Sequence, residues 1–114
     1  MKFSNLVNMA NAAIKGNKIQ EAIKLFNDAL KLNPTSFEVC SKLGLLSFQV
    51  GDLDNSINYF KKTLLLNPKS TFGYSNLGLI YSKLNKQDLA LENYLKAREN
   101  DPKNFLKLNL VYLI

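Results

Sequence analysis

The chain contains no histidine and no tryptophan, and Cys40 is its single cysteine. Without histidine, the common nucleophilic triads, imidazole acid–base catalysis and the commonest metal ligand are all missing. One cysteine can neither close an internal disulfide nor hold zinc by itself, and no glycine-rich phosphate loop is present. We therefore expect no catalytic residues, no metal site and no cofactor, and a protein that is not an enzyme.

Long apolar runs are also scarce, and none before the C-terminus approaches the roughly 20 residues needed to cross a bilayer. The N-terminus carries Lys2, but Asn5, Asn8 and Asn11 interrupt the segment behind it, which is unlike a secretory signal. We expect no membrane span and a cytoplasmic location. The single cysteine agrees with a reducing compartment.

The charge is unbalanced, with 15 basic against 9 acidic residues and a formal net charge of +6. This excess of positive charge is compatible with acidic partners. The 15 Asn and the many Ile, Leu and Phe residues are also typical of AT-biased codon usage, which would explain part of the lysine excess. Arg98 is the sole arginine, whereas nucleic-acid-binding surfaces cluster arginine with exposed aromatics. We expect a protein or peptide partner, for which an acidic character is one option, and not nucleic acid.

An internal repeat is the dominant feature, because Pro34, Pro68 and Pro102 recur every 34 residues. Small residues in two facing helices let their axes approach closely, and an aromatic residue fills the space beside the crossing. Shifting the chain by 34 residues aligns the columns Ala10/Gly44/Gly78, Ala22/Ser56/Ala90, Phe26/Phe60/Tyr94 and Ala29/Thr63/Ala97. Each repeat is therefore expected to be a pair of antiparallel helices whose core is completed by its neighbour.

Turn residues separate the expected helices. Gly16-Asn17, Gly51-Asp52 and Asn85 lie in mid-repeat, where a tight turn needs a residue that tolerates positive φ. The segment Thr35-Ser36-Phe37-Glu38 has the form of a capping box that opens the second repeat. We predict helices over residues 4–15, 18–31, 37–49, 53–66, 71–83, 87–99 and 105–114.

In this pattern the chain resembles the tetratricopeptide repeat family, where a hydrophobic residue, Leu-Gly and an aromatic residue are followed later by Ala, an aromatic residue, Ala and, at the close of the repeat, Pro. The third repeat matches throughout, with Tyr74, Leu77, Gly78, Tyr81, Ala90, Tyr94, Ala97 and Pro102. The second repeat keeps Leu43, Gly44, Phe60 and Pro68, and the first keeps Ala22, Phe26, Ala29 and Pro34.

The resemblance implies an all-α fold, a right-handed superhelical solenoid of antiparallel helix pairs. It also implies a single domain over residues 1–114, with repeats at 3–36, 37–70 and 71–104. Residues 105–114 would then be a partial fourth repeat or a C-terminal capping helix.

In such a stack the first helices of the pairs line a concave surface. We expect three rows of side chains on it, with Phe48 beside them: Asn8/Lys42/Asn76, Asn11/Leu45/Leu79 and Lys15/Gln49/Lys83. Amides and lysines mixed with leucine suit an extended or helical segment that offers apolar anchors and acidic or carbonyl groups. The simpler interpretation is that Leu45, Phe48 and Leu79 are only partly buried by helix packing, and both interpretations stay open.

Some members of the family grip the C-terminal carboxylate of chaperone tails through Lys and Asn in the first repeat, Asn in the second, and Lys and Arg in the third. Here only Asn11 matches, because Val7, Lys42, Phe72 and Asn76 stand at the other positions. A carboxylate needs charge-assisted partners. We therefore predict no strong binding of chaperone tails.

The C-terminal segment 105–114 is apolar on nearly every side, and half a repeat cannot bury its own stripe. We expect it either to continue into further protein or to mediate self-association. The main hypothesis is a non-catalytic scaffold that binds a peptide or partner protein in the concave groove. The alternative is the N-terminal module of a larger transferase or signalling enzyme, truncated at residue 114.

Overall fold

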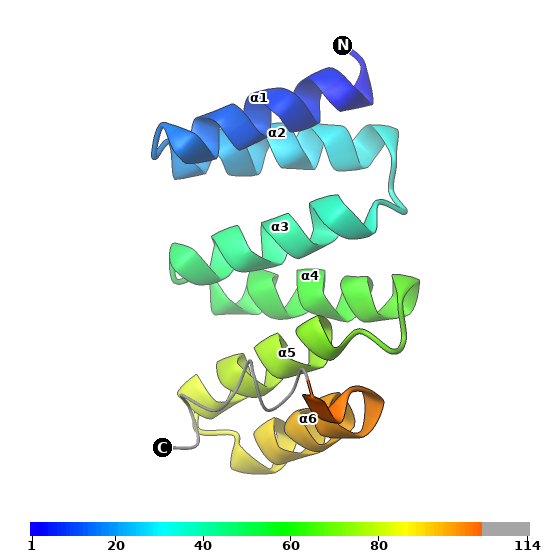
Figure 1. The fold of residues 1–114 in the computed structure, drawn as a ribbon. Helices are drawn as coiled ribbons and strands as arrows, with labels where there is room; N and C mark the ends of the chain where they lie inside the picture. Colours follow the sequence, from blue (N-terminus) through cyan, green and yellow to red (C-terminus); the bar gives the residue numbers. More distant parts are fainter. Residues whose placement is uncertain (104–114) are drawn as a thin grey trace. The chain divides into compact units, whose positions relative to one another are not determined.

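The computed structural model describes residues 1–103, which form six α-helices and no strand (Figure 1). The helices are α1 (Phe3–Lys15), α2 (Ile19–Leu32), α3 (Phe37–Gln49), α4 (Leu53–Leu66), α5 (Thr71–Lys83) and α6 (Gln87–Asn100). Every end lies within one residue of its predicted position. The predicted helix over 105–114 falls outside the described residues.

The chain divides into two compact units, Met1–Tyr59 and Phe60–Ile114, with the boundary inside α4. In the first unit α2 packs against both α1 and α3. The small and aromatic residues of the repeat columns, among them Ala10, Ala22 and Phe26, are completely buried there. The predicted helix-pair core is thus confirmed in this unit.

Two hydrogen bonds tie α4 into the first unit. The Ser56 hydroxyl donates to the Gly44 carbonyl oxygen at 2.7 Å inside the core. The Tyr59 hydroxyl donates to Oδ1 of Asn27 on α2 at 2.8 Å. Ser56 stands in a column that otherwise holds alanine, so its buried hydroxyl is satisfied by a helix carbonyl instead of being left without a partner.

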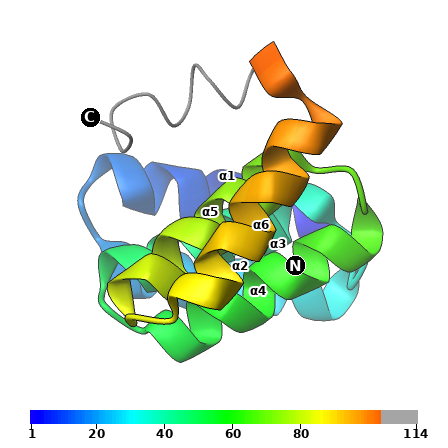
Figure 2. The same cartoon turned by 90° about the horizontal axis from the view of Figure 1, so that it is seen from below.

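In the second unit α5 and α6 lie side by side, as Figures 1 and 2 both show. Gly78 lies against the Tyr94 ring, the contact that the repeat columns predict. The Phe60 and Phe72 rings meet edge to face, with centroids 5.8 Å apart. This geometry aligns the positive edge of one ring with the negative face of the other.

The predicted turns are confirmed, since Asn17, Gly51 and Asn85 have φ values of 58°, 83° and 60°. These values lie in the left-handed region, which asparagine and glycine adopt most readily.

The predicted capping box is wrong by one residue. Ser36, not Thr35, is the N-cap of α3, and its Oγ accepts a hydrogen bond from the Val39 N–H. Thr35 instead donates to Oδ1 of Asn33 through both its N–H and its hydroxyl. Because Asn33 holds Thr35 in the preceding turn, the first residue able to cap the helix is Ser36. Ser70 caps α5 in the same way, one repeat later.

Candidate peptide-binding surface

All ten residues predicted to line the binding surface lie on the first helices of the pairs, and none of them is buried. We refer to these ten residues as the first-helix surface. Its exposed members are Asn8, Lys15, Leu45, Gln49 and Lys83. Its half-buried members are Asn11, Lys42, Phe48, Asn76 and Leu79. The helix periodicity therefore separated these accessible positions from the buried repeat columns.

The first unit holds seven of the ten residues, on α1 and α3. The spacing of Asn8, Asn11 and Lys15 places them on one side of α1, because residues three, four and seven apart share a helix face. Lys42, Leu45 and Gln49 have the same spacing on α3. Leu45 is 41% exposed, so helix packing alone does not account for its apolar side chain.

The second unit holds the other three residues, on α5. The Asn76 amide nitrogen donates to the Phe72 carbonyl oxygen at 2.8 Å, a bond to its own helix that fixes the orientation of the amide. Leu79 is half-buried, as the simpler interpretation, partial burial by helix packing, also predicts. Lys83 is exposed at the end of the helix.

Acidic residues are nearly missing from the first helices. Glu38 is their one acidic residue, whereas the second helices carry six: Glu21, Asp28, Asp54, Asp88, Glu92 and Glu99. The first helices also carry Lys15, Lys42 and Lys83. Helices with this balance of charge attract anionic groups more than cationic ones.

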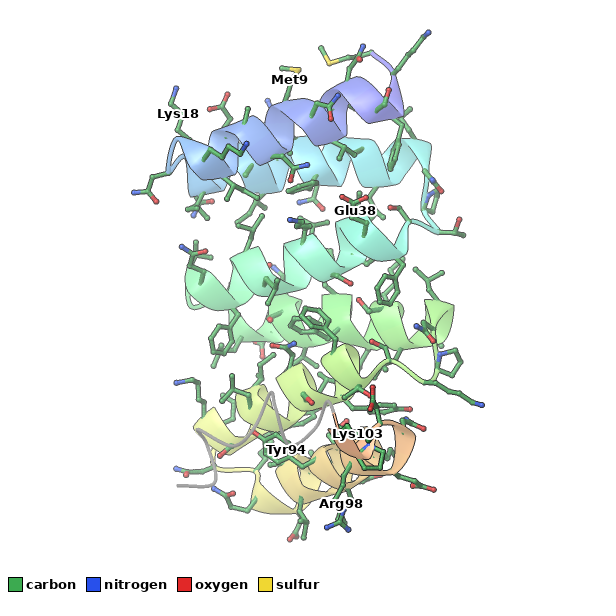
Figure 3. All side chains as sticks on the ribbon, viewed as in Figure 1. Met9, Lys18, Glu38, Tyr94, Arg98 and Lys103 are labelled. Atoms are coloured by element: carbon green, nitrogen blue, oxygen red, sulfur yellow. The ribbon has the colours of Figure 1, made fainter. Side chains whose placement is uncertain are left out.

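Glu38 was missed by the sequence prediction. It is exposed in the first turn of α3, where Figure 3 labels it. It precedes Lys42 by four residues and Leu45 by seven, so it shares their side of the helix. That spacing was visible in the sequence and could have placed Glu38 on the first-helix surface.

Beside this surface lies the column Val7/Ser41/Ser75. Val7 and Ser75 are buried. The Ser41 Oγ is also shielded from solvent, and no hydrogen-bond partner for it lies among residues 1–103. Because Val7 is buried in the position where a chaperone-tail clamp places lysine, this position offers no charge to a carboxylate.

No cluster of three or more Cys, Asp or Glu side chains suited to a metal ion occurs within residues 1–103. Over the same range no helix is both long and apolar enough to span a bilayer.

Family models for the tetratricopeptide repeat match residues 4–36, 37–70 and 72–104, and so together cover most of the chain. No curated protein matches it in sequence.

Solved structures share the fold. The first TPR of Spaghetti (RPAP3) bound to the HSP90 peptide SRMEEVD has a TM-score of 0.84 and 22% identity, over 97% of this chain and 88% of its own. YrrB, described as a TPR protein with an unusual peptide-binding site, has a TM-score of 0.87 and 20% identity, over 98% of this chain and 58% of its own. MamA has a TM-score of 0.83 and 26% identity, over 90% of this chain and 56% of its own.

The chain therefore spans little more than half the length of MamA and of YrrB. The three consecutive family matches agree with the helix pairs, the buried small-residue columns and the left-handed turns described above. This chain belongs to the tetratricopeptide repeat family.

Proposed function

We propose that the chain is a non-catalytic interaction scaffold that binds a peptide segment of a partner protein on the first-helix surface. The observation that supports this most directly is the contrast in burial along the first helices. The small residues of the repeat columns are enclosed in the core, whereas all ten surface residues stay accessible to a ligand. Two of the similar structures, those of Spaghetti and YrrB, are described with a bound peptide or a peptide-binding site.

The chemistry of the surface favours a peptide with an apolar anchor beside acidic side chains. Leu45 and Phe48 offer apolar area on α3, and Lys42 stands one turn from Leu45. Complementary charge speeds association and fixes register, whereas apolar anchors in the centre of a contact supply most of the affinity. Because Val7 is buried at the clamp position, we propose an internal acidic segment in place of a C-terminal carboxylate.

Selection from a library of random linear peptides tests this proposal directly. We expect the retained peptides to combine acidic and apolar residues. Leu45→Ala and Lys42→Glu should each weaken binding by about tenfold, equivalent to about 1.4 kcal/mol, because each removes one of the two contact types. Titration of one labelled peptide against each variant measures the change.

The matched controls are Leu65→Ala and Lys61→Glu, which make the same changes at an exposed leucine and an exposed lysine of α4. Both should bind the peptide as tightly as the unmodified chain. Equal losses at α3 and α4, or no loss at α3, would contradict the proposed surface.

A further inference from the structure

Glu38, the one acidic residue of the first helices, carries a carboxylate that the cap of its own helix does not use. It lies exposed in the first turn of α3 (Figure 3), where Ser36 is the N-cap. The Val39 N–H donates to the Ser36 hydroxyl oxygen, and the Cys40 N–H donates to the Ser36 carbonyl oxygen. Within residues 1–103 the Glu38 side chain has neither a hydrogen bond nor an ion pair, so its charge is available to a ligand.

Lys42 follows Glu38 after one turn of the same helix. An acidic residue four positions before a basic one is the favourable arrangement for an ion pair on a helix. Such a pair forms on α6, where Oε1 of Glu92 lies 3.5 Å from Nζ of Lys96. Glu38 and Lys42 form no ion pair with each other or with any other residue in the range 1–103. The two opposite charges therefore stand side by side on α3 without neutralising each other.

Leu45 and Gln49 continue the same side of α3, because positions 38, 42, 45 and 49 are separated by four, three and four residues. From its N-terminal end, this side presents an acid, a base, an apolar group and an amide. A helix rises about 1.5 Å per residue, so Lys42 lies about 6 Å beyond Glu38 along the axis and Leu45 about 4.5 Å further on.

The positions equivalent to Glu38 in the neighbouring repeats carry no charge. Ser4 of α1 is exposed, and Phe72 of α5 is half-buried, where it meets the Phe60 ring edge to face. Glu38 is therefore a single acidic subsite, which suits one cationic side chain of a ligand and not a run of them.

We propose that Glu38 selects a basic residue in the bound peptide, so that the acidic residue of the peptide lies between this basic residue and the apolar anchor. The inference rests on the proposed peptide binding to the first-helix surface, and it adds the order of charges that the peptide must carry. Side chains two residues apart on an extended peptide share a face and lie about 6.6 Å apart, close to the separation of Glu38 and Lys42. A peptide with the pattern basic-x-acidic-x-apolar, where x is any residue, meets Glu38, Lys42 and Leu45 in turn.

Exchanging charges on both the protein and the peptide tests the inference. The probe is a labelled peptide that the unmodified chain retains from a random linear library, together with a copy in which glutamate replaces its basic residue. The unmodified chain should bind the parent peptide about fivefold more tightly than the copy, the effect of one exposed charge pair. Glu38→Lys should reverse this preference and Glu38→Gln should abolish it. Because the preference is electrostatic, added salt should reduce it.

The matched control is Glu21→Lys, which makes the same change at an exposed glutamate in the first turn of α2. It alters the net charge equally and should keep the preference of the unmodified chain. Urea unfolding of the Glu38 variants identifies a purely structural role, because an acidic residue in the first turn also stabilises a helix through its dipole. That role alone would lower the free energy of unfolding and leave the peptide preference unchanged.

Three outcomes would overturn the inference: retained peptides without a basic residue on the far side of their acidic residue from the apolar anchor, Glu38 variants that keep the original preference, or an equal change with Glu21→Lys. If Leu45→Ala and Lys42→Glu still weaken binding in these cases, the proposed function stands without the Glu38 subsite. A library from which the chain retains no peptide would overturn both.

Discussion

A methyl group on Gly78 would lie 2.7 Å from Cε1 of Tyr94 and within 3.0 Å of two further ring atoms. Side-chain carbons do not approach each other so closely, and a ring cannot bend away as a flexible chain end can. The glycine therefore lets α6 place its aromatic residue against α5. At Gly16, by contrast, an added methyl group would meet only carbonyl oxygens at 3.7 Å.

Gly78→Ala should lower the free energy of unfolding by about 1–3 kcal/mol, the usual cost of overpacking a core. The loss should appear although alanine favours helix over glycine by about 1 kcal/mol. Urea unfolding followed by circular dichroism measures it. Gly16→Ala is the control and should change stability by less than about 1 kcal/mol, since its site has room. Similar values for the two variants would show that the Tyr94 contact does not limit packing.

At the scale of the helices, a serine one residue before the first turn sets where α3 and α5 begin. Ser36 and Ser70, one repeat apart, each accept a hydrogen bond from the N–H three residues on. A helix leaves its first N–H groups without backbone partners, and a serine hydroxyl satisfies one of them. The other helices whose N-caps are described, α1, α2 and α6, start without a side-chain cap.

Ser36→Ala should therefore destabilise the chain by about 0.5–2 kcal/mol, the range measured for lost N-caps. Thr35→Ala should cost less, because it removes only the exposed hydrogen bond from the Thr35 hydroxyl to the Asn33 side chain and keeps the one from the backbone N–H. Thermal and urea unfolding of both variants give the comparison. A larger loss of stability for Thr35→Ala than for Ser36→Ala would indicate that Thr35 caps α3, as the sequence suggested.

At the scale of the whole molecule, the positive charge is spread over the surface. Of the 15 basic residues, three lie on the first helices, six on the second helices and the other six elsewhere in the chain. Binding to a nucleic-acid backbone depends on many cations acting along one track. An even spread provides weak, general attraction to polyanions.

Retention on heparin should accordingly be short and should disappear with modest salt. Reversing Lys42 and Lys83 on the first helices should reduce retention no more than reversing Lys61 and Lys62 on α4. Stepwise salt elution of the two double variants measures this. A loss confined to Lys42 and Lys83 would identify a specific polyanion site on the first helices and contradict the even spread.

Much of the fold was predictable because its determinants are local. The prolines established the period, Asn17, Gly51 and Asn85 marked the turns, and helix periodicity assigned the buried columns. Each of these signals acts within a few residues along the chain. The same periodicity identified ten accessible residues on the first helices, although whether they bind a peptide remains a proposal.

The sequence by itself determined the repeat, the helix pairs and the side of each helix that enters a core. Only the tertiary structure decided that Ser36 caps α3, that Met9 lies exposed where Leu43 is buried, and that Leu91 is 59% exposed where Ile23 is half-buried. The reason is physical. A residue's type and phase indicate which face it prefers, but its burial depends on whether a neighbouring helix is present to cover that face.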